Sequence, residues 1–134
     1  MSQQSVEVVR GHIEAFRQGD ASGALSYLDP HVVWDPSRAR GIDVPVAYGH
    51  EEVIQMTRHY IGAFEDYDYQ ERRLTDLGSG AVLALVTETG RGKGSGVPVR
   101  RSFAALYTVI DGKIARVTFF ASEEQALEAA GLSE

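Results

Sequence analysis

Apolar residues recur at helical spacing at the start of the chain. Four of them, each three or four residues from the next, predict a first helix: Val6, Val9, Ile13 and Phe16. Gly19 is placed to end this helix. Asp20 is placed to cap a short second helix, which ends at 29–30, where an aspartate precedes a proline.

A short strand and a third helix are predicted next. The strand covers 32–34, and a loop follows over 36–49, where prolines and glycines recur. Glu51 and Glu52 carry the negative charge that suits a helix N-terminus. The residues expected on the buried stripe of this helix are Val53, Thr57, Tyr60, Ile61 and Phe64.

After Asp66 the pattern changes to the alternation of a strand. Four strands are predicted, over about 68–77, 80–90, 97–110 and 113–121. Asp111 before Gly112 is typical of a tight hairpin turn, and Ser122 with Gln125 forms a capping box for a last short helix. This order predicts an α+β fold in which residues 1–134 form one domain, with helices on one side of a curved antiparallel sheet.

Two predicted strand segments, 81–86 and 103–110, are apolar on both of their alternating faces. A sheet with one face in water alternates apolar and polar residues, so both faces of this sheet are expected to be covered. Helices cover one face. A second copy of the chain would cover the other, which predicts a homodimer through the sheet face. The alternative is a sheet curled so that the C-terminal helix buries part of its outer face.

Composition narrows the classes of partner. The chain of 134 residues is 43% hydrophobic and has a net charge of −6. An acidic chain without a basic stripe is a poor binder of nucleic acid, and no apolar run is long enough to span a membrane. The N-terminus lacks the pattern of a signal peptide, so a cytoplasmic protein is expected.

The sequence offers little for a metal or a phosphate group. There is no cysteine, and the histidines lack the spacing of a metal site, so no metal is expected. In the glycine-rich segment 90–96, Lys93 is followed by glycine rather than Ser or Thr, which favours a hairpin connection over a phosphate-binding loop. Glu88 and Arg101 are expected on adjacent strands, where they either pair or face solvent.

Several short motifs, spread over essentially the whole chain, resemble those of one superfamily. They lie at 16–20, 28–36, 48–51, 94–99, 111–114 and 128–132. With this order of elements, the chain resembles the nuclear-transport-factor-two-like superfamily, in its SnoaL-like and ketosteroid-isomerase-like branch. The resemblance implies a cone-shaped sheet wrapped around three N-terminal helices. It also implies an apolar pocket for a small hydrophobic ligand, and no cofactor.

Three residues fall at acid–base positions of that branch. Asp35 takes the position of the general base of ketosteroid isomerase, and a carboxylate partly removed from water beside Trp34 would be a stronger base. The alternative is that Asp35 belongs to a strand-exit turn. Tyr27 and His12 match tyrosines that support the hydroxyl network and donate to the oxyanion. The alternatives are the amphipathic end of a helix for Tyr27 and a core histidine for His12.

Other residues are expected around the pocket. Three aromatic residues either line its mouth or belong to the core: Trp34, Tyr48 and Tyr60. Three apolar residues are expected to line a dry wall: Val117, Phe119 and Ala121. Ala105 is also expected beside the ligand. Because Ala105 and Phe119 stand where the isomerase and the polyketide cyclases carry acid–base groups, neither of those sites is expected to be complete here.

Three functions are compatible with these residues. The first is a cofactor-free isomerase, dehydratase or cyclase for a hydrophobic carbonyl compound, with Asp35 as base and His12 or Tyr27 as donor. The second is a binding protein that holds an apolar metabolite without catalysis. The third is a dimeric interaction module that uses the sheet face to bind a partner. This function is the least supported of the three, because pairing of the face with a second copy already explains its apolar residues.

Overall fold

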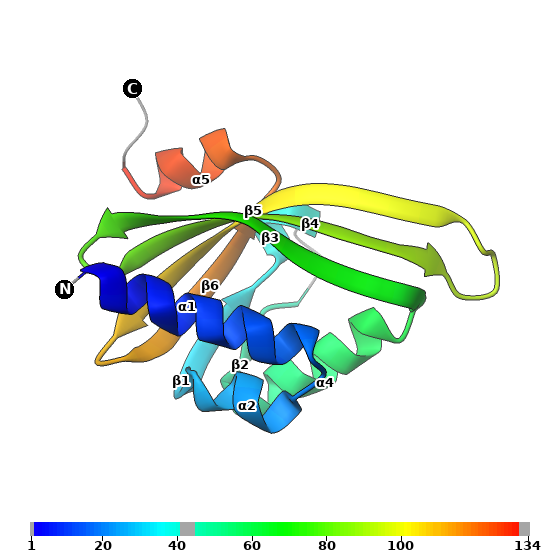
Figure 1. Ribbon diagram of the computed structural model, residues 1–134, viewed down its shortest axis with the longest axis horizontal. Helices are drawn as coiled ribbons and strands as arrows, with labels where there is room; N and C mark the ends of the chain where they lie inside the picture. Colours follow the sequence, from blue (N-terminus) through cyan, green and yellow to red (C-terminus); the bar gives the residue numbers. More distant parts are fainter. Residues whose placement is uncertain (1, 41–44, 132–134) are drawn as a thin grey trace.

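The computed structural model describes residues 2–40 and 45–131; residues 41–44 of the predicted loop and Leu132 of the last motif lie outside the described residues. Three helices lie on one face of a sheet, and a short helix lies on the other (Figure 1). The first group is α1 (Ser2–Arg17), α2 (Ala21–Ser26) and α4 (Gly49–Ile61), and the short helix is α5 (Glu123–Ala129).

The first two helices form for local reasons. Val9 and Ile13 of α1 are buried on the side that faces the sheet. Gly19 has a φ of +75°, a left-handed conformation that glycine adopts without a steric cost. The Asp20 carboxylate accepts a hydrogen bond from the backbone N–H of Gly23 at 2.9 Å, so the predicted cap of α2 is confirmed.

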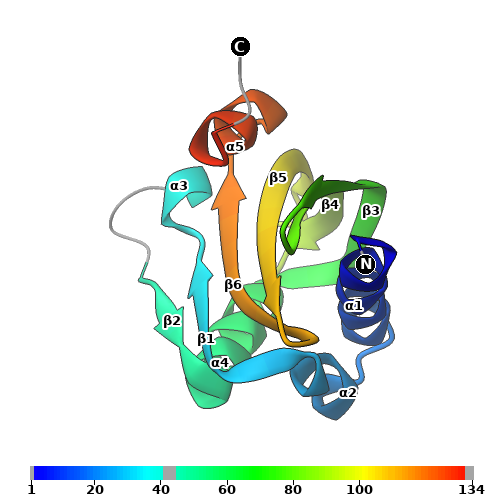
Figure 2. The same ribbon diagram turned by 90° about the vertical axis from the view of Figure 1, so that its left-hand side faces the viewer.

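Six strands form one curved, unclosed sheet, seen from its end in Figure 2. They are β1 (Leu28–Asp35), β2 (Ala47–Tyr48), β3 (Phe64–Gly78), β4 (Ala81–Gly92), β5 (Pro98–Ile110) and β6 (Lys113–Phe120). Their order across the sheet is β2-β1-β6-β5-β4-β3. All neighbours are antiparallel except β1 and β6, which run parallel.

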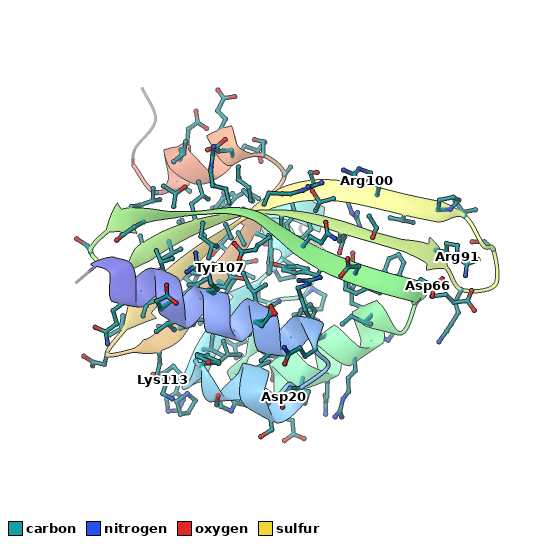
Figure 3. The ribbon with its side chains drawn as sticks, viewed as in Figure 1. Asp20, Asp66, Arg91, Arg100, Tyr107 and Lys113 are labelled. Atoms are coloured by element: carbon teal, nitrogen blue, oxygen red, sulfur yellow. The ribbon has the colours of Figure 1, made fainter. Side chains whose placement is uncertain are left out.

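The last four strands confirm the predicted meander. The turn at Asp111 and Gly112 has positive φ at both residues, as the hairpin signal requires. β3, β4 and β5 are long and run past the rest of the sheet to the connection predicted at 90–96 (Figure 1). Near the end of β4, Arg91 donates a hydrogen bond of 2.7 Å to Asp66 of β3 (Figure 3).

Four local predictions were wrong at their edges. The second helix ends at Ser26 rather than at 29–30, because Leu28 already belongs to β1. Phe64 belongs to β3 and not to the third helix, because its backbone lies opposite Gly92 of β4. The strand predicted over 32–34 begins at Leu28, since this stretch pairs with distant residues of β6. The predicted loop contains β2 and a short helix, α3 (Ser37–Arg40).

The sheet separates two apolar clusters. The larger lies between the sheet and α1, α2 and α4. The smaller lies on the outer face, where Ala126 of α5 packs with Leu83, Ala104 and Phe120. The C-terminal helix thus covers part of the outer face. This arrangement is the one that the sequence analysis gave as the alternative to a dimer. Leu85 and Leu106 of the same face remain partly exposed.

Candidate active site

Two adjoining cavities lie between the helices and the concave face of the sheet. The first, which we call the helix cavity, has a volume of about 390 Å³ and is lined mainly by α1, α2 and α4. The second, the sheet cavity, has a volume of about 100 Å³ and lies between α4 and the sheet. Four residues line both: Phe16, Trp34, Thr57 and Ile61. Apolar cavities of this total size are typical of small-molecule sites.

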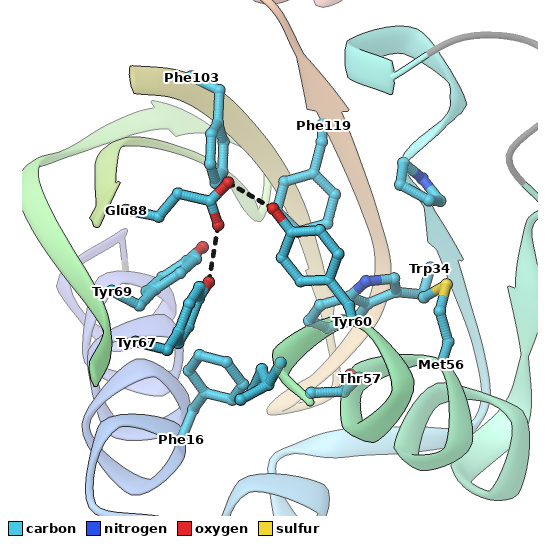
Figure 4. Close-up of a pocket in the computed structure, with 12 residues that line it drawn as sticks. Phe16, Trp34, Met56, Thr57, Tyr60, Tyr67, Tyr69, Glu88, Phe103 and Phe119 are labelled. Carbon is cyan, nitrogen blue, oxygen red and sulfur yellow. Dashed lines mark hydrogen bonds between the residues drawn. The ribbon is translucent and has the colours of Figure 1, made fainter. Parts of the chain in front are cut away.

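A buried carboxylate faces the sheet cavity. Glu88 of β4 is only 1% exposed. The hydroxyl of Tyr60, from α4, donates a hydrogen bond of 2.5 Å to one carboxylate oxygen of Glu88, and the hydroxyl of Tyr67, from β3, donates one of 2.8 Å to the other (Figure 4). A helix and two strands therefore converge on one ionisable group inside an aromatic cavity.

Arg101 completes this cluster. It lies directly opposite Glu88 on the adjacent strand, and its Nε donates a hydrogen bond of 3.1 Å to the carboxylate. A second guanidinium nitrogen donates to the hydroxyl of Tyr60 at 2.8 Å. Burial would lower the pKa of Arg101, but Tyr60 and Glu88 outweigh it and raise that pKa above its usual value. The buried negative charge is thus one half of an ion pair whose other half reaches solvent.

Aromatic rings form the rest of the cavity wall. The ring of Phe119 lies 5.4 Å from Trp34 and 5.6 Å from Phe103, centroid to centroid. Phe16 of α1 packs edge-on against Tyr69 of β3, with centroids 5.2 Å apart. These arrangements favour a flat, apolar ligand that can stack or meet ring edges.

A pair of tyrosines lies deeper. The hydroxyls of Tyr69 and Tyr107 are hydrogen-bonded to each other. Burial raises the pKa of both phenols above their usual value. Both side chains are therefore neutral at ordinary pH and act as hydroxyls rather than as phenolates.

His12 lies on α1 with its ring inside the molecule and 4% exposed. Its Nδ1 lies 2.9 Å from the carbonyl oxygen of Ala24. Burial lowers the pKa of His12, and the hydrogen bond to Ala24 raises it less, so the ring is more readily neutral than a free histidine. His12 lines the helix cavity beside Trp34.

Asp35 points away from both cavities. Trp34 lies opposite Val117 and Asp35 opposite Thr118, so the two neighbours take opposite faces of the sheet. One carboxylate oxygen accepts hydrogen bonds from the backbone and the hydroxyl of Ser37, at 2.9 and 2.6 Å. Burial raises the pKa of Asp35, but these bonds and the charges of Arg116 and Arg38 outweigh it, so the pKa lies below its usual value.

The remaining sequence candidates divide into two groups. Tyr60, Trp34 and Phe119 line the sheet cavity. Five others do not: Tyr27, Tyr48, Ala105, Val117 and Ala121. Tyr48 is 61% exposed at the start of α4, and the Tyr27 ring packs beside Gly11 of α1. Ala105 and Val117 belong to the buried core.

The sequence predicted Glu88 and Arg101 on adjacent strands, either paired or facing solvent, and the pairing is confirmed. The sequence reasoning did not, however, assign Glu88 or Tyr67 to the site. A signal for Glu88 was available in the alternation of β4. Val82, Ala84, Val86 and Glu88 occupy every second position, and all are buried. A carboxylate that continues a buried apolar face is a candidate functional group, because an ionised side chain is costly to bury without a partner.

The family model for the SnoaL-like domain matches residues 9–117. The chain belongs to the SnoaL-like domain family. The match runs from α1 into β6 and so includes every residue of the cluster around Glu88. No curated protein matched the sequence.

Solved structures of this SnoaL-like chain's relatives share its fold at low identity. A protein with a ketosteroid-isomerase-like fold from Catenulispora acidiphila, in complex with trimethylamine, is 17% identical with a TM-score of 0.74, over 94% of this chain and 93% of that one. A proposed polyketide cyclase from Xanthomonas campestris is 22% identical with a TM-score of 0.71, over 98% of both chains. An epoxide hydrolase of Mycobacterium tuberculosis is 15% identical with a TM-score of 0.69, over 88% and 82%.

In residues 2–40 and 45–131, no three or more histidine, aspartate or glutamate side chains are grouped so that they could hold a metal ion. No helix in the same ranges is long and apolar enough to cross a membrane.

Proposed function

We propose that this SnoaL-like protein binds a small hydrophobic carbonyl compound and catalyses proton transfer on it without a cofactor, with Glu88 as the acid–base group. The observation that supports the proposal is a buried carboxylate, held by two tyrosines and an arginine, that faces an aromatic cavity. Isomerases, dehydratases and cyclases of carbonyl compounds share the step that such a group performs, removal of a proton from carbon beside the carbonyl.

In this step Glu88 takes the proton and the carbonyl becomes an enolate. Once Glu88 is neutral, the hydroxyls of Tyr60 and Tyr67 no longer face a carboxylate and can donate to the enolate oxygen instead. Donors that strengthen as charge develops on the substrate lower the barrier of the reaction. Glu88 then returns the proton to the same or another carbon. Arg101 keeps the charge of the cluster balanced from the solvent side.

Asp35 is the alternative candidate for the general base. We favour Glu88 because Asp35 faces the other side of the sheet and is held by Ser37 and Arg116. Tyr27 is proposed to support the site only by packing against α1.

One observation favours a second function, binding without catalysis. Glu88 accepts hydrogen bonds from three donors, and a carboxylate with many donors is a weaker base. The aromatic walls would hold an apolar metabolite in either case.

Exchange of hydrogen for deuterium separates the two functions without knowledge of the natural substrate. β-Tetralone is a hydrophobic ketone whose hydrogens beside the carbonyl exchange slowly with D₂O, and NMR follows the exchange. We expect the protein to accelerate it and Glu88→Gln to reduce the acceleration by about 10²–10⁴-fold, the usual contribution of a general base.

Two further variants complete the assay. Glu123→Gln, at an exposed carboxylate of α5, should leave exchange unchanged. Asp35→Asn should also retain it. Loss of exchange in Asp35→Asn but not in Glu88→Gln would make Asp35 the base. Binding of β-tetralone with no acceleration at all would favour the binding protein.

We also propose that the protein is a homodimer through the outer face of the sheet. The support is the pair Leu85 and Leu106, which remain partly exposed beside the cluster that α5 covers.

A further inference from the structure

The hydrogen bond of His12 fixes which of its two ring nitrogens carries a proton. The Ala24 carbonyl oxygen can only accept, so the Nδ1 atom 2.9 Å away must carry the hydrogen. A buried histidine with a lowered pKa is neutral near pH 7, and a neutral imidazole has one N–H. Nε2 is therefore a bare acceptor.

His12, which carries this acceptor, lies where two of the cavities meet. Beside the helix cavity is a third one of about 20 Å³, the inner cavity, lined by His12, Ile13, Phe16, Trp34, Tyr69 and Tyr107. Even this volume is enough for a water molecule or a hydroxyl group. No side chain or backbone group in the described parts of the chain donates to Nε2.

Among the described residues, no fully buried side-chain nitrogen or oxygen lacks a hydrogen-bond partner, so the unpartnered Nε2 retains accessible surface. The His12 ring meets Trp34 and Tyr107 edge-on, with centroids 5.8 and 6.4 Å apart. These contacts hold the ring plane, so Nε2 keeps its direction. The sequence resemblance implied a donor at this position, and a neutral ring with its hydrogen on Nδ1 cannot donate from Nε2.

We propose that Nε2 of His12 binds a hydroxyl group of the ligand, and that the substrates of this site are therefore hydroxylated hydrophobic compounds of the enol or phenol class. The inference rests on the proposed function, because it adds a second anchor to the same pocket. One end of the ligand meets Glu88, and a hydroxyl donates to His12. This hydroxyl is a second group of the ligand, separate from the carbonyl oxygen that Tyr60 and Tyr67 are proposed to contact.

A matched pair of ligands tests the anchor. β-Naphthol and its methyl ether differ only in the hydrogen that Nε2 would accept. Titration calorimetry should show that the wild-type protein binds the naphthol about fivefold to tenfold more tightly, the effect of one hydrogen bond.

Two substitutions of His12 distinguish the role of Nδ1 from the role of Nε2. In His12→Asn the amide N–H can replace Nδ1 at Ala24 and nothing replaces Nε2, so the preference for naphthol should vanish while affinity for the ether stays within about twofold. In His12→Gln the longer side chain can bring an amide oxygen toward the Nε2 position, and part of the preference should return. Nitrogen NMR of the wild-type ring should show a protonated Nδ1 and a bare Nε2.

The outcomes distinguish this inference from the proposed function. Equal binding of the two compounds by the wild-type protein, or a protonated Nε2, would overturn the His12 anchor and leave Glu88 untouched. Glu88→Gln should abolish exchange of β-tetralone yet keep the preference for naphthol. Failure of both naphthalenes to bind would overturn the pocket itself, and the anchor with it.

Discussion

Two buried carboxylates on opposite faces of one sheet differ in what holds them. Glu88 has two tyrosines that reach it from the cavity and an arginine that reaches it from the solvent side. Asp35 has a serine two residues away and an arginine on the outer face. The first is a group placed by three separate elements, whereas the second mainly closes a local turn that begins α3.

The role of Asp35 makes a prediction about acid stability. Its pKa in the folded protein lies below the ordinary value of 3.8, so the ionised form stabilises the fold above that pH. The contribution is lost as the pH falls through the folded pKa. Asp35→Asn should reduce the free energy of unfolding by about 1–3 kcal/mol near pH 7, as for a hydrogen bond to a charged group.

Urea unfolding over a pH series checks this. The difference between wild type and Asp35→Asn should shrink below pH 3.8, with Glu124→Gln, an exposed carboxylate of α5, as the control that shows little difference at any pH. A difference that is constant with pH would contradict the assignment of Asp35 as a stabilising ionised group.

At the residue scale, the sequence alone does not show which side chains face the cavity, because this depends on how the strands pair. Trp34 and Asp35 are adjacent, and only the pairing of β1 with β6 decides which of them faces the cavity. Tyr60 and Tyr67 donate hydrogen bonds to Glu88 although they lie 28 and 21 residues away from it in the sequence. The aromatic character of the pocket and the buried position of Glu88 were therefore open to prediction from the sequence, but the tyrosine partners of Glu88 were not.

At the scale of elements, local signals located the turns and caps. The Asp111–Gly112 hairpin, the cap at Asp20 and the cap at Ser122 all lie within a few residues of the elements they define. The parallel pairing of β1 with β6 and the two-residue strand β2 have no such local cause, because they depend on partners elsewhere in the chain. Those elements were the ones missed or shortened.

The turn between β3 and β4 offers a matched pair of glycines. Gly78 and Gly80 have φ of +91° and +85°. A Cβ at Gly78 would meet nothing within 4 Å, whereas one at Gly80 would collide with the carbonyl oxygen of Val109. Gly78→Ala should cost about 1–2 kcal/mol for the backbone conformation alone, and Gly80→Ala at least about twice that.

Thermal and chemical unfolding of the two variants measure the difference. Because Gly80 also accepts a hydrogen bond from the backbone of Val109 at 2.8 Å, a displaced turn would disturb the edge of β5 as well. Equal costs at the two positions would mean that the turn moves freely away from β5.

At the scale of the whole molecule, the proposed dimer through the outer face of the sheet makes a prediction about the mass of the protein in solution. Light scattering coupled to gel filtration should give about twice the chain mass of 14.6 kDa at micromolar concentration. Leu85→Glu should give a folded monomer, since a charge on this face opposes its burial in an interface. Val97→Glu, at an exposed position in the β4–β5 connection, should remain dimeric. A wild-type monomer would show that α5 alone covers the face sufficiently.

The position of Trp34 has a practical consequence. The chain has a single tryptophan, and it lines the helix cavity, the sheet cavity and the inner cavity together. Its fluorescence therefore reports on the site alone, without a background from other tryptophans. A library of ketones and metabolites can be screened on the unlabelled protein, because a molecule that enters any of the three cavities changes the surroundings of the same indole. The pocket carries its own optical reporter.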